Sequence, residues 1–235
     1  MFATLLAFPL WVIPPNSFDF PNHERTALVY KGQGTCNDGC AKAAAQVARR
    51  AGFKVKYIGL SNMTSEALAA ADLWVQPGGD AIELAMTYGP AKLALLRDYI
   101  ARGGKYLGFC AGAFLTDSTV DDAETVPGLG LFPGTTFDYF PSSEAMILPL
   151  DWHGAPRDIY YQEGPAFRLE SAFVGEVVAR YASGAPATIQ FPYGRGKVSI
   201  AGPHPEAPED WKDSLHDSDG SDFDLADQMV DSLFQ

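Results

Sequence analysis

The chain has 235 residues, of which 47% are hydrophobic and 20% charged, so its composition is that of a globular protein and excludes general disorder. By length it is one large domain rather than a pair of small ones. It carries 17 basic and 29 acidic residues, a formal net charge of −12, and a protein this acidic repels phosphate backbones and anionic lipid headgroups. Nucleic acid is therefore not expected as a partner, and no apolar run approaches the roughly 20 residues that span a bilayer.

Residues 1–25 are predicted to form an N-terminal extension, and residues 26–235 a single folded domain. Residues 2–13 (FATLLAFPLWVI) have the length of a signal-peptide apolar region, but no basic flank precedes them and no small-x-small cleavage site follows. We expect a mature surface segment, with a degenerate signal as the alternative. The protein is expected to be secreted or lumenal if the segment is a signal remnant, and cytoplasmic otherwise.

In the first half of the domain, predicted strands alternate with predicted helices. The strands are residues 26–30, 53–58, 72–76 and 105–109, and the helices are residues 38–51, 64–70, 90–102 and 111–116. Alternation at this spacing is typical of parallel βαβ units.

The second half contains short predicted strands separated by turn residues, followed by a last helix. The strands are residues 129–132, 145–150, 159–162, 176–181, 187–191 and 197–201, and the helix is residues 223–233. An antiparallel extension of the same sheet explains them most economically. The predicted fold class is α/β: a flavodoxin-like, doubly wound, mostly parallel sheet with helices on both faces and antiparallel additions in the C-terminal half.

The strongest chemical signal is Gly108-Phe109-Cys110-Ala111-Gly112, where a predicted strand meets a helix. Two flanking glycines allow the close strand–helix approach of a nucleophile elbow, here with cysteine as the nucleophile. The helix N-terminus that follows favours the thiolate form. The alternative is a buried structural cysteine between two packing glycines.

Two further segments follow predicted parallel strands. In Gly202-Pro203-His204-Pro205-Glu206, an extended backbone places His204 and Glu206 on one face, the base-and-orienter arrangement that a cysteine nucleophile needs. The turn that contains Gly78 and Gly79 can expose backbone N–H groups for an oxyanion hole, with the N–H of Ala111 as a second donor. An ordinary turn is the alternative for each segment.

Other clusters carry weaker signals. Cys36 and Cys40 lack the second ligand pair of a zinc site, and we expect them to form a local disulfide in an exported protein or free thiols in a cytosolic one. Residues 217–224 (DSDGSDFD) have carboxylates at calcium-like spacing but miss the EF-hand pattern, so a solvated loop that caps the last helix is expected and no metal is predicted. A third group consists of residues that could border the pocket or simply pack: Asp151, Trp152, His153, Tyr160, Tyr161 and Glu163.

Taken in order, the PGG turn, GxCxG and HPE resemble the class I glutamine amidotransferase superfamily over roughly residues 26–206. That resemblance implies Cys110 as nucleophile, His204 as its base, Glu206 as the orienter of the histidine, and Gly78 or Gly79 as an oxyanion donor. A narrower set of segments (YKGQGT, QPGGD, GGKYLGFCAGAF, YYQEGPAF and GPHPE) resembles the N-terminal domain of the fungal biotin–protein ligases, which is amidotransferase-like and also occurs as stand-alone proteins. The chain has no ligase portion, so biotinylation is not implied.

These features predict a cysteine-dependent amide hydrolase or amidotransferase-like protein with a Cys-His-Glu triad and no cofactor. Its expected substrate is a small amide or a peptide-like carbonyl compound. Because an acceptor domain for ammonia is not found in the chain, we expect weak or no hydrolysis of free glutamine, and the net charge favours neutral or cationic substrates. The alternative is a non-catalytic small-molecule-binding or regulatory module that retains the pocket. The sequence does not predict the oligomeric state.

Overall fold

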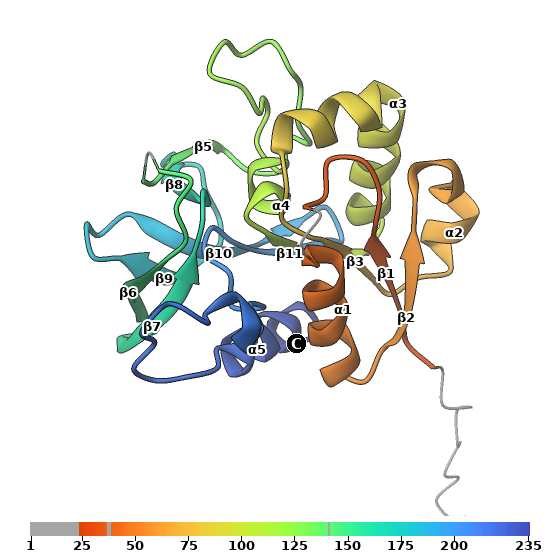
Figure 1. The fold of residues 1–235 in the computed structure, drawn as a ribbon. Helices are drawn as coiled ribbons and strands as arrows, with labels where there is room; N and C mark the ends of the chain where they lie inside the picture. Colours follow the sequence, from red (N-terminus) through yellow and green to blue (C-terminus); the bar gives the residue numbers. More distant parts are fainter. Residues whose placement is uncertain (1–23, 37–38, 141) are drawn as a thin grey trace, which may run out of the picture.

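A computed structural model describes residues 24–36, 39–140 and 142–235, so the expected N-terminal segment 2–13 lies outside the described residues. The strands are β1 (Thr26–Tyr30), β2 (Lys54–Ile58), β3 (Leu73–Gln76), β4 (Lys105–Phe109), β5 (Gly134–Asp138), β6 (Met146–Trp152), β7 (Ala155–Tyr161), β8 (Pro165–Leu169), β9 (Glu176–Tyr181), β10 (Pro186–Tyr193) and β11 (Gly196–Ala201). Nine of them form one sheet in the order β2-β1-β3-β4-β11-β10-β9-β6-β7, while β5 and β8 form a separate antiparallel pair (Figure 1).

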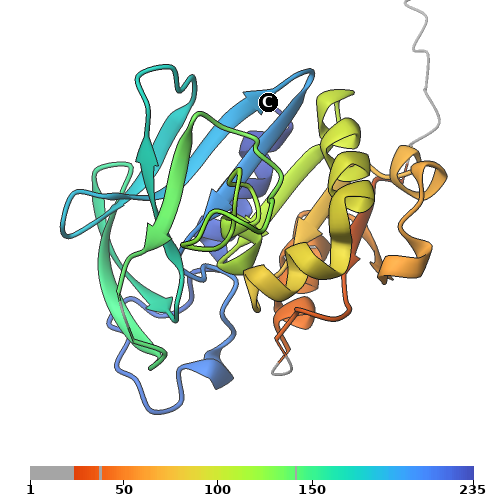
Figure 2. The same cartoon turned by 90° about the horizontal axis from the view of Figure 1, so that it is seen from above.

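Helices cover both faces of this sheet (Figures 1 and 2). The helices are α1 (Cys40–Arg50), α2 (Ser65–Ala69), α3 (Ala81–Ala101), α4 (Ala111–Phe114) and α5 (Phe223–Leu233). One apolar core lies between the sheet and α1 with α5, and the other between the sheet and α2, α3 and α4. Along β1, Ala27 and Val29 enter the first core and Leu28 and Tyr30 the second, which explains why this strand is apolar throughout. The predicted doubly wound α/β fold is confirmed.

The parallel part of the sheet has the order expected for a flavodoxin-like fold, with β2, β1, β3, β4 and β11 side by side. Strands β1 to β4 pair parallel, and β11 pairs parallel with β4. Beyond β11 the sheet continues through the antiparallel strands β10, β9, β6 and β7, as predicted for the C-terminal half. Because β4 and β11 are neighbouring parallel strands, their carboxyl ends lie at the same edge of the sheet.

The predicted strand at residues 129–132 is wrong. Leu129 donates its N–H to the carbonyl of Leu115, and Leu131 donates to Thr116, so this segment bonds to the loop after α4 and not to a strand. Its apolar side chains are buried in the second core, which explains why the run resembles a strand in the sequence. The strand lies further along the chain, at β5, and its partner β8 was not predicted.

The predicted helix at residues 90–102 is the second part of α3. The helix begins at Ala81, where the Asp80 carboxylate accepts a hydrogen bond from the N–H of Glu83 at 2.9 Å. Gly89, with φ 58°, precedes Pro90 and kinks the helix, so the proline that suggested a start lies within a longer element. Within the described ranges, no helix is both long and apolar enough to cross a membrane.

Candidate functional site

Cys110 lies on a sharp turn between β4 and α4, with φ 49° and ψ −108°. A positive φ is unfavourable for a residue with a side chain, and this strain presents the thiol at the edge of the sheet. Both flanking glycines are required by close contacts. A Cβ on Gly112 would lie 2.4 Å from the carbonyl oxygen of Gln76, and one on Gly108 would lie 2.7 Å from that of Gly112. The strand, the strained turn and the helix have the local geometry that the predicted elbow requires.

His204 follows β11, the strand next to β4, so the fold brings it to the same edge as Cys110. Its backbone N–H donates to the carbonyl of Tyr160 at 2.9 Å, and its Nδ1 lies 2.9 Å from Oε1 of Glu206. Both side chains are buried, with Glu206 fully inaccessible. The prediction that this pair lies on an extended segment is wrong, because residues 205–206 form a turn. Ala207 donates its N–H to the carbonyl of His204 at 3.0 Å, and a turn through Pro205 brings the two side chains together.

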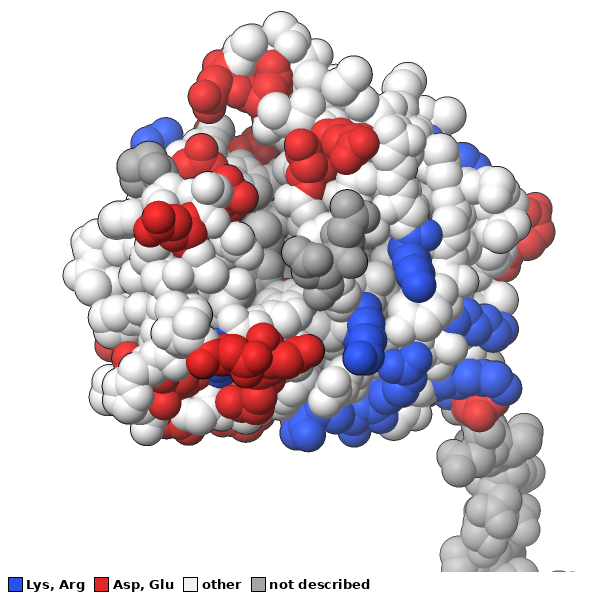
Figure 3. Space-filling model, viewed as in Figure 1, with Lys and Arg blue, Asp and Glu red and all other residues white. Residues whose placement is uncertain are grey.

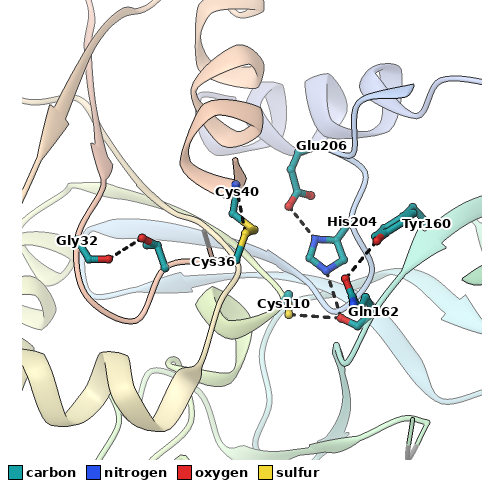
Figure 4. Close-up of a disulfide and its surroundings, with 9 residues drawn as sticks. Gly32, Cys36, Cys40, Cys110, Tyr160, Gln162, His204 and Glu206 are labelled. Carbon is teal, nitrogen blue, oxygen red and sulfur yellow. Dashed lines mark hydrogen bonds and ion pairs between the residues drawn. A yellow bond between two sulfur atoms is a disulfide. The ribbon is translucent and has the colours of Figure 1, made fainter. Parts of the chain in front are cut away.

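A third segment meets the thiol and the imidazole through Gln162 (Figure 4) and meets the thiol also through Glu163. The carbonyl oxygen of Gln162 is 3.3 Å from Nε2 of His204 and 3.7 Å from the sulfur of Cys110, and that of Glu163 is 3.8 Å from the same sulfur. Glu163 has φ 51°, and a Cβ on Gly164 would lie 1.9 Å from the carbonyl oxygen of Gly202. This tight backbone contact places two carbonyl groups beside the thiol.

The environment of His204 favours its protonated form. Burial lowers the pKa of the imidazole, but the charges and hydrogen bonds of Glu206 and Cys110 outweigh burial and hold the pKa well above its usual value. The rings of Tyr160 and Trp211 meet the imidazole edge-to-face at centroid distances of 5.7 and 5.8 Å. These contacts limit the rotation of the ring.

Of the three predicted oxyanion positions, Gly78 and Ala111 lie next to Cys110, and Gly79 lines the same cleft. A Cβ on Gly78 would lie 3.5 Å from the Cβ of Cys110 and 3.2 Å from Cε1 of His204. Gly79 has φ 150°, and its Cβ would lie 2.0 Å from the carbonyl oxygen of Gly34, so only glycine fits this turn. Ala111 begins α4 directly after Cys110.

Cys36 and Cys40 form a disulfide, while Cys110 is a free, buried thiol. The N–H of Cys40, the first residue of α1, lies 3.3 Å from the sulfur of Cys36. Figure 4 places this disulfide beside Cys110 and His204. The pairing is the one that the sequence argument expected for an exported protein.

A cleft of about 1160 Å³ opens at this edge of the sheet, and Cys110, His204, Cys36 and Cys40 all line it. Eight other lining residues are acidic: Asp80, Glu83, Asp117, Asp121, Asp122, Glu124, Asp138 and Glu163. Arg168 is the sole lysine or arginine in the described lining, and its guanidinium lies 5.0 Å from the Phe137 ring centroid. Figure 3 shows acidic side chains around the hollowed upper part of this face, whereas the basic ones gather near α1 and β2.

Other residues singled out in the sequence lie elsewhere or have structural roles. Tyr160 and Glu163 line the cleft, but Tyr161 is buried in the first core. Asp151, Trp152 and His153 lie at the β6–β7 hairpin, where the indole of Trp152 donates to Gln228 at 3.1 Å. None of these three hairpin residues lines the described cleft.

The acidic segment 217–224 is partly buried, so the predicted solvated loop is wrong for its central carboxylates. The ammonium of Lys212 bonds Asp217 and Asp222, and Arg157 pairs with Asp219, Asp222 and Asp224. Two basic side chains therefore pair with the four carboxyl groups of this cluster and offset part of their charge. In the part of the chain that the structure describes, no group of acidic, histidine or cysteine side chains has the arrangement of a metal site.

The sequence gives no local signal for the part that Gln162 and Trp211 play in the site. Gln162 contributes through its backbone carbonyl, a group that every residue has, so its side chain gave no signal. Trp211 follows the HPE turn and packs on His204 from a short 3₁₀ helix, Glu209–Trp211. The YYQEG segment was recognised only as part of a family resemblance.

The family described as biotin–protein ligase, N terminal, matches residues 25–233. Among curated proteins, the biotin–protein ligase of Schizosaccharomyces pombe is 28% identical over 180 residues, which is 66% of this chain and 28% of the ligase. The chain thus spans less than a third of that relative, so the similarity concerns one region of the ligase.

Solved structures with the same fold include two glutamine amidotransferases. One is 21% identical with a TM-score of 0.60, and the match covers 76% of this chain and 90% of the other. The second, from Thermotoga maritima, is 13% identical with a TM-score of 0.58, covering 90% and 97% of the two chains. At these identities the comparison establishes the fold alone.

Proposed function

The chain belongs to the biotin–protein ligase N-terminal family, and we propose that it is a cysteine-dependent amide hydrolase or amide transferase. In this proposal Cys110 is the nucleophile, His204 transfers the proton and Glu206 orients the imidazole. The observation that carries the proposal is the position of the His204 ring, with Nδ1 2.9 Å from Glu206 and Nε2 facing Gln162 next to the strained Cys110.

The hydrogen-bond partners of His204 support an ion pair in the resting site. The Gln162 carbonyl and the Glu206 carboxylate both accept hydrogen bonds, so each ring nitrogen is required to donate. An imidazole that donates from both nitrogens is an imidazolium. In this proposal its counterion is Cys110 as the thiolate, the nucleophilic form of cysteine.

The proposed reaction proceeds through a thioester. The Cys110 sulfur attacks the amide carbonyl carbon, and the oxyanion accepts hydrogen bonds from the N–H of Ala111 and from that of Gly78 or Gly79. Nε2 of His204 gives its proton to the leaving nitrogen as the C–N bond breaks. Water then attacks the thioester while His204 takes a proton from it, and cleavage of the C–S bond restores the Cys110 thiolate and the His204 imidazolium.

Two features of the cleft support an amide substrate that carries positive charge. The carbonyl oxygens of Gln162 and Glu163 beside the sulfur accept N–H groups, which a carboxamide or a peptide supplies and a simple ester does not. The acidic lining around Arg168 creates a negative potential that raises the local concentration of cations. In the described residues, no ion pair neutralises Asp122, Asp138 or Glu163. A small amide with a basic side chain is therefore the substrate class that we propose.

The test uses three acetylated amino-acid amides that differ in one side chain: lysine, norleucine and glutamate. We expect amine or ammonia release in the order lysine, norleucine, glutamate, with weak or no hydrolysis of free glutamine. Cys110→Ala is the matched control for each substrate and should abolish release. Equal rates for wild type and Cys110→Ala would refute the proposed role of Cys110 as the nucleophile of an amide hydrolase. Cys110-dependent glutamine turnover on the order of 1 s⁻¹ would instead identify the protein as a glutaminase.

The carbonyl groups that crowd the sulfur of Cys110 also favour a second candidate, a binding or regulatory module that uses the cleft without turnover. Calorimetric titration with the same amides separates the two functions. A binding module binds the lysine amide equally well with and without the thiol and releases no amine. An enzyme binds it and turns it over only with Cys110.

A further inference from the structure

The disulfide and the free thiol of this protein line one cleft, and both lie next to Gly78. A Cβ built on Gly78 would lie 3.5 Å from the Cβ of Cys110 and also 3.5 Å from the sulfur of Cys40. The Cβ of Cys110 therefore lies within about 7 Å of the Cys40 sulfur, with Gly78 next to both. Glycine leaves that space open.

The two sulfur atoms of the disulfide differ in a way that fixes the direction of an attack. The sulfur of Cys40 faces Gly78, whereas that of Cys36 lies 3.3 Å from the N–H of Cys40 at the start of α1. The residue before this helix is Gly39, which has no side chain to cap the first turn. A negative charge on Cys36 would be stabilised by that N–H and by the positive end of an 11-residue helix.

We propose that Cys110 exchanges with this disulfide, so that the protein alternates between a Cys36–Cys40 form and a Cys40–Cys110 form. The thiolate of Cys110 attacks the sulfur of Cys40, a Cys40–Cys110 bond forms, the Cys36–Cys40 bond breaks, and Cys36 leaves as the thiolate. One disulfide and one thiolate are present before and after, so the step needs no oxidant or reductant. The inference rests on the proposed function only in taking Cys110 to be a reactive thiolate.

The exchange would make the site sensitive to thiols. In the Cys40–Cys110 form the nucleophile is blocked, and attack by Cys36 on Cys40 restores it. A small thiol reductant opens either disulfide and leaves Cys110 free. The 36–40 disulfide is then a switch for the thiol beside it as well as a link in the first βα loop.

The first measurement follows wild type with no oxidant present. The protein is held at pH 8, quenched in acid, labelled with N-ethylmaleimide and mapped by mass spectrometry without reduction. We expect two populations: one with the label on Cys110, and one with the label on Cys36 and a peptide that links Cys40 to Cys110. A label confined to Cys110 overturns the proposal.

The second measurement compares two matched variants, each with two remaining cysteines, during oxidation by diamide. In Cys36→Ser the pair is Cys40 and Cys110, and in Cys40→Ser it is Cys36 and Cys110. We expect the first pair to link at least about tenfold faster, because the sulfur of Cys40 faces Cys110 across Gly78. Equal linking rates would contradict the assignment of Cys40 as the sulfur attacked.

The amide assay on the double variant Cys36→Ser/Cys40→Ser separates this inference from the proposed function. This variant keeps Cys110 as its sole cysteine. If hydrolysis requires Cys110 and wild type shows no exchange, the disulfide switch is refuted and the proposed enzymatic function is supported. If wild type shows exchange but no amide is hydrolysed, the disulfide switch is supported and the proposed enzymatic function is refuted.

Discussion

His204 and Glu206 meet across a turn, with Nδ1 of the imidazole 2.9 Å from Oε1 of the carboxylate. The turn is closed by the N–H of Ala207, which donates to the carbonyl of His204, and Pro205 lies within it. Because proline fixes its own φ, the turn loses little conformational freedom on folding. The pairing sets which nitrogen faces the carboxylate and leaves Nε2 to face the cleft.

This pairing predicts how the variant Glu206→Gln behaves. Burial lowers the pKa of His204, and the charges of Glu206 and Cys110 raise it well above the usual value, so loss of the carboxylate lowers this pKa. Less imidazolium then remains to stabilise the Cys110 thiolate. We expect the alkylation rate of Cys110 by iodoacetamide at pH 7 to fall at least about tenfold. The alkaline limb of the pH–rate profile should also move to lower pH.

Mass spectrometry of the Cys110 peptide across pH 5–10 measures this effect. The exposed Glu209→Gln, on the 3₁₀ helix after the turn, is the matched loss of one carboxylate and should leave the profile unchanged. An unchanged profile in Glu206→Gln would show that the carboxylate does not control the imidazole.

Much of this site was predictable because its side-chain signals are local in the sequence. GxCxG follows a strand directly, and the close contacts of Gly108 and Gly112 with neighbouring backbone explain why both residues are glycines. The HPE segment follows β11, and the pairing of β11 with β4 places it beside the thiol. Each signal needed only the rule that parallel strands end at the same edge.

The unpredicted parts depend on contacts between distant segments. Gln162 faces the thiol with its main chain, and the approach of Gly164 to Gly202 sets its position, a relationship that no local pattern encodes. Residues 129–132 are apolar because a loop is buried there, and periodicity does not separate a buried loop from a buried strand. The carboxylates of the acidic segment are held by Arg157, which lies about 60 residues earlier in the chain.

The close approach at the elbow predicts the cost of Gly112→Ala. The added methyl group would lie 2.4 Å from the carbonyl oxygen of Gln76, and backbone atoms cannot move aside as a flexible side chain can. We expect the free energy of unfolding to fall by about 1–3 kcal/mol or more, measured by urea denaturation. Gly59→Ala is the control, because its Cβ has one neighbour, at 3.7 Å, and its φ is −99°. Equal losses in the two variants would refute the steric explanation.

The buried carboxyl group of Asp222 should make the free energy of unfolding depend on pH. Burial raises the pKa of this carboxyl to about 7, although Lys212 and Arg157 lower it. The folded state therefore holds a proton that the unfolded state loses near pH 4, so this group makes the protein less stable as pH rises from about 4 to 7. The slope is at most about 1.4 kcal/mol per pH unit.

Unfolding of Asp222→Asn at several pH values tests this expectation. The variant cannot titrate at this position, so its stability should fall less than that of wild type between pH 4 and 7. Asp231→Asn, which removes an exposed carboxylate of the same helix α5, should follow wild type. A slope that Asp222→Asn does not alter would contradict the role given to this carboxyl.

The Cys36–Cys40 disulfide closes a short loop, and this predicts a modest contribution to stability. A bond across a sequence separation of 4 removes about 2 kcal/mol of chain entropy from the unfolded state at 25 °C. We expect a reductant such as a phosphine to lower the free energy of unfolding of wild type by that amount. The Cys36→Ser/Cys40→Ser variant should not respond to the reductant, and a response there would assign the effect to something other than this bond.

Gly78→Ala is expected to affect the chemistry more than the fold. Its methyl group would lie 3.2 Å from Cε1 of His204 and 3.5 Å from both the Cβ of Cys110 and the sulfur of Cys40. Gly78 does not have a positive φ, so the variant carries no backbone strain, and we expect its free energy of unfolding to change by less than about 1 kcal/mol.

The same methyl group fills the space where the proposed reactions take place. We expect the kcat/KM for the acetylated lysine amide to fall at least about tenfold, and the Cys40–Cys110 link in the Cys36→Ser background to form more slowly. Gly59→Ala is the control for a glycine with a negative φ, −99°, and an uncrowded Cβ whose one neighbour lies at 3.7 Å, and it should leave both rates unchanged. If Gly78→Ala lowers neither rate while remaining folded, the space between Cys110, His204 and Cys40 is not where the substrate and the second sulfur meet the thiol. If Gly78→Ala loses hydrolysis but forms the Cys40–Cys110 disulfide at an unchanged rate, the substrate binds in the space next to Gly78. The two sulfur atoms then approach each other by another route.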